Sequence, residues 1–124
     1  MMIKANDDLR QEVIALQCMR RMQAMFKKAG LRLWLRPFDL LITSSNSAII
    51  EFMNDTISIT ALKEKLAKMN KPQLPTLKLF YKWYFFSNFE EARLNFIRSL
   101  AGYSLFTYLF AIKDRHNGNI LIDR

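Results

Sequence analysis

The chain has 124 residues, of which 51% are hydrophobic, so it can bury an apolar core and is not disordered by composition. Its single cysteine, Cys18, excludes an internal disulfide and a Cys-x-x-Cys metal site. The net charge of +8 favours an anionic partner, such as nucleic acid, an acidic membrane surface or a phosphorylated ligand, although scattered cations also occur on simply basic domains.

The N-terminal part of the sequence predicts a strand followed by a helix. Residues 2–4 are typical of the end of a strand, and apolar residues then recur at steps of three and four through residues 7–29. Residues 6–8 offer a polar cap and acidic first-turn side chains, and Gly30 ends the helix. No charged and apolar leader is present at the start, so we expect a protein that is not secreted.

Three short apolar runs follow. Residues 31–35 alternate in hydrophobicity as a strand does, and Pro37 interrupts the pattern. Residues 39–43 and 48–52 flank a Ser-Ser-Asn-Ser turn and predict a β-hairpin. We expect Phe38, Ile50 and Met53 to contribute to the core.

The second half of the chain is mostly helical by pattern. Ser58 caps a short helix, and Asn88 caps a long one whose first turn is acidic. The predicted elements are a helix over 58–66, a polar linker over 68–75, helices over 77–86 and 89–112, and a strand over 119–122. Together these elements predict the α+β class. The chain stops directly after the last strand, which suggests truncation.

One stretch, residues 94–112, is long and apolar enough to be compared with a membrane span. Asn95, Arg98 and Ser99 lie inside it, and an arginine near a helix centre costs about 2.5–3.5 kcal/mol on insertion. We therefore predict a buried helix. A small membrane-anchored protein is the alternative.

The stretch from Lys113 to Asp123 combines potential acid–base groups, a cation and amides after the long helix. Phosphoryl transfer needs cations on the phosphates, a held metal and a group that accepts the proton of the attacking hydroxyl. His116 or Asp114 could accept that proton, and the side-chain oxygen of Asn119 suits Mg²⁺. By composition alone, a solvated surface turn is the competing interpretation.

Residues Lys113–Ile120 read K-D-R-H-N-G-N-I, which resembles the catalytic loop of the phosphatidylinositol 3-/4-kinase superfamily and most resembles its beta-type 4-kinases. The resemblance implies that Asp114, Arg115 and His116 are catalytic-loop residues and that Asn119 binds the metal. We favour His116 as the base with Asp114 orienting it, and expect Arg115 to have a structural role.

Two further motifs carry the same resemblance. Lys4 to Glu12 matches a family strand-to-helix junction, which implies that Lys4 reaches an ATP phosphate and that Glu12 supports it. The family's usual glycine is Asn6 here, a residue type that tolerates a left-handed turn. Phe38, Glu51 and Met53 fall where the family lines the adenine pocket and bonds the base at its inter-lobe hinge.

The resemblance implies a partial protein-kinase-like bilobal fold. Residues 1–53 would be the end of the N-lobe with the hinge, and residues 54–124 the helical start of the C-lobe. The phosphate loop and the D-F-G and activation segments are absent from these residues, and the length is too small for a whole kinase core.

The implied reaction transfers phosphate from ATP to phosphatidylinositol, giving phosphatidylinositol 4-phosphate, with Mg²⁺ or Mn²⁺ as cofactor. The implied partners are ATP and phosphatidylinositol in membranes, without nucleic acid, and the implied location is cytoplasmic and peripheral on Golgi-associated membranes. We expect the isolated chain to be inactive. The alternatives are a phosphatidylinositol 3-kinase fragment and a non-catalytic remnant.

Overall fold

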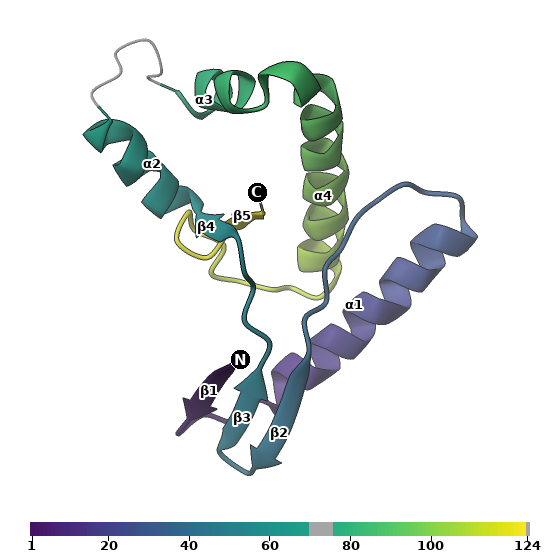
Figure 1. Cartoon of the computed structure of the whole chain (residues 1–124). Helices are drawn as coiled ribbons and strands as arrows, with labels where there is room; N and C mark the ends of the chain where they lie inside the picture. The colour runs from purple at the N-terminus through teal and green to yellow at the C-terminus, as the bar shows by residue number, and fades with distance from the viewer. Residues whose placement is uncertain (70–75, 124) are drawn as a thin grey trace. The chain divides into compact units, whose positions relative to one another are not determined.

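The computed structural model describes residues 1–69 and 76–123 (Figure 1). The described residues form four α-helices and two small antiparallel sheets, so the α+β class is confirmed. The chain divides into two compact units. The first unit comprises Met1–Asn54 and Arg98–Ala111, and the second comprises Asp55–Ile97 and Ile112–Arg124.

The first unit contains a three-stranded sheet and a long helix. Strand β1 (Met2–Ala5) and strand β2 (Leu40–Ser44) both pair antiparallel with β3 (Ser47–Ile50), which gives the order β1-β3-β2. Helix α1 (Arg10–Lys28) connects β1 to the segment before β2. The N-terminal strand and the β-hairpin predicted from the sequence are therefore confirmed, and the hairpin strand β3 ends at Ile50.

One face of α1 supplies much of the apolar core of the first unit. The spacing of three and four residues places its apolar side chains on one side of the helix. The buried apolar residues of this unit are Leu9, Leu16, Met22, Phe26, Leu35, Ala48 and Phe106. Phe38, Ile50 and Met53, which the sequence assigned to the core, are only half-buried.

Helix α1 starts later than its sequence pattern predicts. Leu9 is the N-cap residue and makes no side-chain capping bond. The carboxylate of Asp8 instead accepts hydrogen bonds from the backbone N–H and the guanidinium of Arg10, which lowers the pKa of Asp8 to about 2. At the other end, Gly30 has a φ of 68°, and the N–H of Leu31 donates to the carbonyl of Phe26, so the predicted glycine stop is confirmed.

The strand predicted over residues 31–35 is wrong. The backbone N–H of Trp34 donates to the carbonyl of Arg98, and the carbonyl of Leu35 accepts from Gln23. Because these polar groups bond to two helices rather than to a neighbouring strand, the alternating pattern does not produce a strand here.

The second unit is mostly helical. It contains β4 (Thr56–Ser58), α2 (Ile59–Lys68), α3 (Leu77–Tyr84), a 3-10 turn η1 (Phe86–Asn88) and β5 (Leu121–Asp123). Strands β4 and β5 pair antiparallel, and β4 was not expected from the sequence. The hydroxyl of Ser58 accepts from the N–H of Ala61, which confirms the predicted cap. Residues 70–75 of the predicted linker lie outside the described residues.

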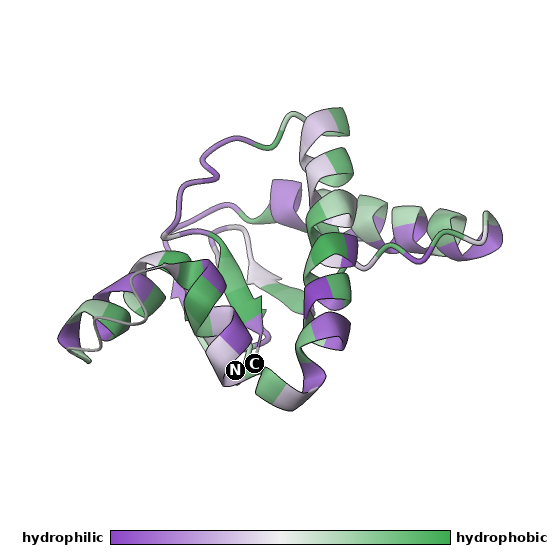
Figure 2. Ribbon diagram, turned by 90° about the horizontal axis from the view of Figure 1, so that it is seen from above, coloured by the Kyte–Doolittle hydropathy of each residue, from purple (hydrophilic) through white to green (hydrophobic). Residues whose placement is uncertain are grey.

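The long helix α4 (Phe89–Leu109) extends through both units. It ends three residues before the predicted stop, and Ala111 then has a φ of 49°. Asn88, predicted as its cap, lies in η1, where its N–H donates to Phe85. Hydrophilic residues interrupt the hydrophobic ones along the helices (Figure 2), and no helix within the described ranges is long and apolar enough to cross a membrane.

Candidate functional site

The polar loop that follows α4 is organised around Asp114 and Asn119. Asp114 has a φ of 58°, which brings its backbone and side chain into reach of Asn119. The side-chain amide of Asn119 donates to the Asp114 carbonyl at 3.0 Å and to its carboxylate at 2.9 Å. Since the NH₂ group is engaged by Asp114, the oxygen of the Asn119 amide is the atom left to bind a cation.

His116 is held on two sides within the same loop. Its Nε2 lies 3.6 Å from a carboxylate oxygen of Asp114, and its Nδ1 accepts the backbone N–H of Gly118 at 3.0 Å. A neutral imidazole whose Nδ1 accepts a hydrogen bond carries its proton on Nε2. A Cβ at Gly118 would lie 2.8 Å from the ring, so a glycine at this position lets the imidazole approach closely.

The side chains of this loop are open to solvent. His116 and Asp114 are 63% and 74% exposed, so a ligand can reach both groups. The guanidinium of Arg115 donates to the carbonyl of Lys113 at 3.0 Å, a contact within the loop.

The N-terminus of α2 anchors the loop backbone. The N–H groups of Ile59 and Thr60 donate to the carbonyls of Ile120 and Asn117, each at 3.1 Å. Pairing of β4 with β5 continues this connection beyond Ile120. Sequence reasoning missed these contacts because they join segments far apart in the chain; the Ser58 cap was visible, but nothing in the sequence identifies what the first helical donors bind.

Lys4 and Glu12 lie in the first unit, on β1 and α1. The ammonium of Lys4 pairs with Asp7 at 2.5 Å, and this hydrogen bond, together with the charge of Glu12, raises the pKa of Lys4. One carboxylate oxygen of Glu12 is buried and has no hydrogen-bond partner among the described residues. Asn6, which replaces the family glycine, has a φ of 62°, so the expected left-handed turn is present.

Phe38, Glu51 and Met53 also lie in the first unit, next to the end of the hairpin. Asp39 and Glu51 exchange two hydrogen bonds: the Glu51 N–H donates to the Asp39 carbonyl at 2.8 Å, and the Asp39 N–H donates to the Glu51 carboxylate at 2.9 Å. Arg20 of α1 donates to the Phe38 carbonyl and to the Asp39 carboxylate. The segments on either side of the hairpin are thus fixed to each other and to α1.

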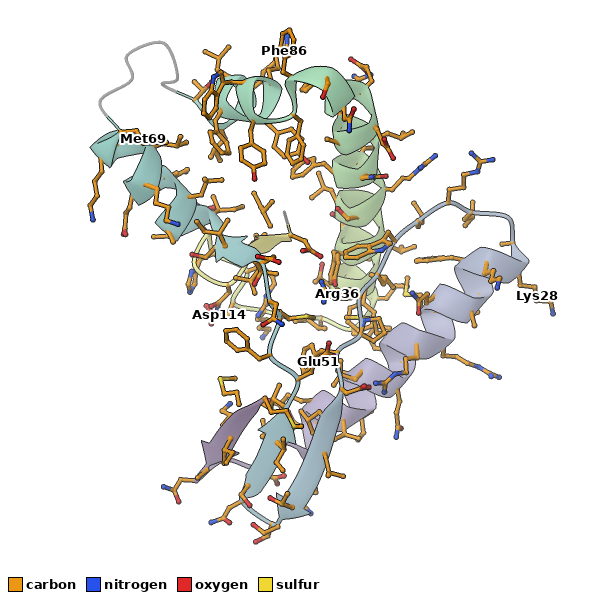
Figure 3. All side chains as sticks on the ribbon, viewed as in Figure 1. Lys28, Arg36, Glu51, Met69, Phe86 and Asp114 are labelled. Carbon is orange, nitrogen blue, oxygen red and sulfur yellow. The ribbon has the colours of Figure 1, made fainter. Side chains whose placement is uncertain are left out.

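The residues predicted to bind ATP all lie in the first unit, and those of the predicted catalytic loop all lie in the second. Figure 3 shows Glu51 on the segment after β3 and Asp114 on the loop between α4 and β5. Within residues 1–69 and 76–123, no group of three or more histidine, cysteine, aspartate or glutamate side chains is arranged to hold a metal. The oxygens of Asn119 and Asp114 are nevertheless the ligand type that Mg²⁺ or Mn²⁺ prefers.

The family model for "Phosphatidylinositol 3- and 4-kinase" matches residues 1–124, that is, the whole chain. The chain therefore belongs to this family.

The individual relatives that match are named as phosphatidylinositol 4-kinases, a subset of this family. The chain is 45% identical over 124 residues to phosphatidylinositol 4-kinase beta 2 of Arabidopsis thaliana, covering 98% of this chain and 11% of that protein. It is 42% identical over 126 residues to phosphatidylinositol 4-kinase of Dictyostelium discoideum and 40% identical over 124 residues to phosphatidylinositol 4-kinase beta of Danio rerio. Those matches cover 98% of this chain and 10% and 14% of the relatives, so the chain spans a small part of their length.

Proposed function

We propose that this chain is part of the catalytic domain of a phosphatidylinositol 4-kinase, which transfers the γ-phosphate of ATP to the 4-hydroxyl of phosphatidylinositol. The observation that carries the proposal is the Asp114–His116–Asn119 cluster, in which an acid–base pair and a metal-binding amide share one loop. Membership of the phosphatidylinositol 3- and 4-kinase family supports the reaction class, and the 4-kinase names of the relatives support the position phosphorylated.

The fold proposal divides the chain into two partial lobes. Residues 1–53 form the end of an N-lobe with its hinge, and residues 54–124 form the helical start of a C-lobe. The strand–helix–hairpin order of the first residues and the helical content of the rest support this division.

Lys4 is proposed to bind an ATP phosphate, with Glu12 supporting it. The hydrogen bond to Asp7 contributes most to raising the pKa of Lys4, and the charge of Glu12 also raises it, which favours this pairing. The unpartnered carboxylate oxygen of Glu12 is available to receive the ammonium when Lys4 leaves Asp7.

The adenine is proposed to bind between Phe38 and the segment from Glu51 to Met53. Because the Glu51 N–H is engaged by Asp39, the group that Glu51 offers to the base is its carbonyl, which accepts from an exocyclic amine. Phe38 and Met53 provide half-buried apolar surface for the ring.

In the catalytic loop, His116 or Asp114 takes the proton of the inositol hydroxyl, and we favour His116. Proton acceptance at Nδ1 requires release of its hydrogen bond from Gly118, while Asp114 holds the Nε2 side of the ring. Asn119, with its NH₂ group fixed by Asp114, holds the divalent cation through its oxygen. When bound, the cation neutralises charge on the transferring phosphoryl group.

The net charge of +8 suits attraction to an acidic cytoplasmic leaflet, where the lipid substrate would be reached from a peripheral position. The location that we propose is cytoplasmic and peripheral on Golgi-associated membranes.

Replacement of the loop residues tests the proposal. In the native protein that contains this chain, His116→Ala should lower turnover of phosphatidylinositol by at least about 100-fold, because general-base catalysis alone contributes roughly 10²–10⁴. Asn119→Ala should lower it by a similar factor, because the cation that Asn119 would hold neutralises charge on the transferring phosphoryl group. The exposed α2 substitution Lys63→Ala is the matched control. Near-normal turnover in both loop variants would exclude the roles assigned to His116 and Asn119. Formation of phosphatidylinositol 3-phosphate as the product would show that the protein is a 3-kinase and not a 4-kinase.

The mass of the protein that the cell makes decides whether these roles belong to a larger enzyme or to these 124 residues alone. An antibody raised against residues 59–69 would measure its mass in whole-cell extract. A product several-fold larger than 14.7 kDa is expected. A product near 14.7 kDa with ATP- and lipid-dependent turnover would overturn the expectation that these residues alone are inactive.

A further inference from the structure

Two backbone N–H groups at the N-terminus of α2 donate hydrogen bonds to the loop that follows α4. The first N–H groups of an α-helix have no partner within the helix and are usually satisfied by a capping side chain or by water. In α2, the Ala61 N–H is satisfied by the Ser58 hydroxyl. The Ile59 and Thr60 donors bind carbonyls of the 113–120 loop instead.

These two hydrogen bonds hold the loop on either side of Asn119. The Ile59 donor fixes the Ile120 carbonyl, and the Thr60 donor fixes the Asn117 carbonyl. Between them, the N–H of Asn119 donates to the His116 carbonyl at 2.9 Å, and its side chain bonds to Asp114. The two anchored carbonyls therefore lie one residue after and two residues before Asn119, and hydrogen bonds within the loop link Asn119 to His116 and Asp114.

We propose that the backbone donors of Ile59 and Thr60 are the positioning device of the catalytic loop. This inference rests on the proposed kinase function and assigns a role to residues outside the loop motif. Neither residue contacts substrate; both act through the carbonyls flanking Asn119. Since a misplacement of about 1 Å can cost on the order of 100-fold in rate, loss of one donor should reduce turnover without affecting nucleotide binding at Lys4 and the hinge.

Ile59→Pro removes the backbone donor of residue 59 and leaves that of Thr60 in place. Proline is accepted at the first helical position, and the preceding Ser58 has φ −69° and ψ 151°, the extended conformation that a residue before proline prefers. The proline ring also occupies the space of the N–H, so the Ile120 carbonyl must move away.

Two matched controls separate positioning from stability. Ile59→Ala removes the same side chain and keeps the N–H. Ser58→Ala removes the side-chain cap and so weakens the same end of α2, but it leaves both donors to the loop in place. Hydrogen exchange at the amides of Asn119 and Ile120 reports loop order, and turnover of the native protein is resolved into kcat and the KM for ATP.

The expected result is faster exchange at Asn119 and about a 100-fold lower kcat in Ile59→Pro, with the KM for ATP unchanged and both controls close to wild type. Equal kcat and exchange in Ile59→Pro and Ile59→Ala would overturn the proposal. So would an equal loss in Ser58→Ala, which would mean that helix stability alone matters.

This design distinguishes failure of the proposed kinase function from failure of the proposed positioning role. If the native protein phosphorylates no phosphatidylinositol, the proposed function fails, while exchange at Asn119 still decides whether the donors order the loop. If Ile59→Pro does not fold, replacing the amide before residue 59 by an ester removes the same donor without the ring and gives the same readings.

Discussion

At the scale of single residues, the candidate site depends on backbone conformations that most side chains avoid. Asn6 and Asp114 both have a positive φ, of 62° and 58°. Left-handed residues cost an ordinary L-amino acid about 1–2 kcal/mol, and asparagine and aspartate are the types that tolerate it best. Asn6 lies between the proposed site residues Lys4 and Glu12, and Asp114 is itself a proposed site residue, so their side chains are part of how the backbone turns there.

The turn at Asn6 gives a stability prediction. Asn6→Val should lower the free energy of unfolding by about 1–2 kcal/mol, because a β-branched residue is strained at φ 62°, whereas Asn6→Gly should leave it unchanged or raise it. Urea denaturation of the three proteins measures this. A valine variant as stable as the parent chain would show that the turn is not maintained in solution.

The contact between Gly118 and His116 gives a spectroscopic prediction. The neutral imidazole should be the Nε2–H tautomer, because Nδ1 accepts the Gly118 N–H. Gly118→Ala places a Cβ 2.8 Å from the ring, which must then turn away, so the tautomers should mix while stability changes by less than about 0.5 kcal/mol.

Nitrogen chemical shifts of His116 at alkaline pH measure the tautomer. Asn117→Ala, next to this contact, is the control that adds no atom against the ring. Identical nitrogen shifts in the parent and Gly118→Ala would mean that the Gly118 bond does not fix the imidazole.

At the scale of elements, α4 and the segment before the hairpin are fitted closely at one point. A Cβ at Gly102 would lie 2.6 Å from the Trp34 carbonyl oxygen, a backbone atom that cannot turn aside. Gly102→Ala should therefore destabilise the chain by about 1–2 kcal/mol: overpacking costs 1–3 kcal/mol, and the better helix propensity of alanine offsets part of it.

The exposed Ser104→Ala on the same helix is the control and should change stability by less than about 0.5 kcal/mol. Thermal unfolding compares the two variants. Should Gly102→Ala be as stable as Ser104→Ala, the close approach of Trp34 to α4 would be excluded.

The sequence predicted the elements whose signals are local. The periodic face of α1, its Gly30 stop and the Ser58 cap are visible in the residues themselves. The segment 31–35 misled the prediction, because the partners of Trp34 and Leu35 are supplied by distant helices. Strand β4 was missed for the same reason: three residues become a strand only when β5 lies beside them.

The polar side chains of the site could be selected from the sequence because their types and spacing carry the chemistry. Their hydrogen-bond partners could not. Nothing in the spacing shows that Asn119 bonds to Asp114 through its NH₂ group, or that Lys4 pairs with Asp7 rather than with Glu12. The functional assignment of all these residues stays a prediction until the variants are measured.

At the scale of the whole molecule, buried apolar side chains are distributed unequally. Of the eight buried apolar residues in the described part of the chain, only Leu62 belongs to the second unit. Because burial of apolar surface is the main stabilising contribution, we expect the second unit to open more readily than the first.

Hydrogen exchange tests this difference. Amides in α2 (Ile59–Lys68) should exchange at least tenfold faster than those in the centre of α1 (Arg10–Lys28) under native conditions. Both helices are compared within one sample, so solvent conditions are matched. Equal protection of the two helices would show that the units unfold together.

The pairing of β4 with β5 has a consequence for synthesis of the protein. Thr56–Ser58 leaves the ribosome well before Leu121–Asp123, with α2, α3 and α4 translated in between. At about 5–20 residues per second, the first strand waits several seconds for its partner. During that interval the α2 donors and β4 have no loop to bind, so the nascent chain exposes this edge to chaperones and to neighbouring chains. Slowing translation after residue 68 should therefore lower the yield of folded protein.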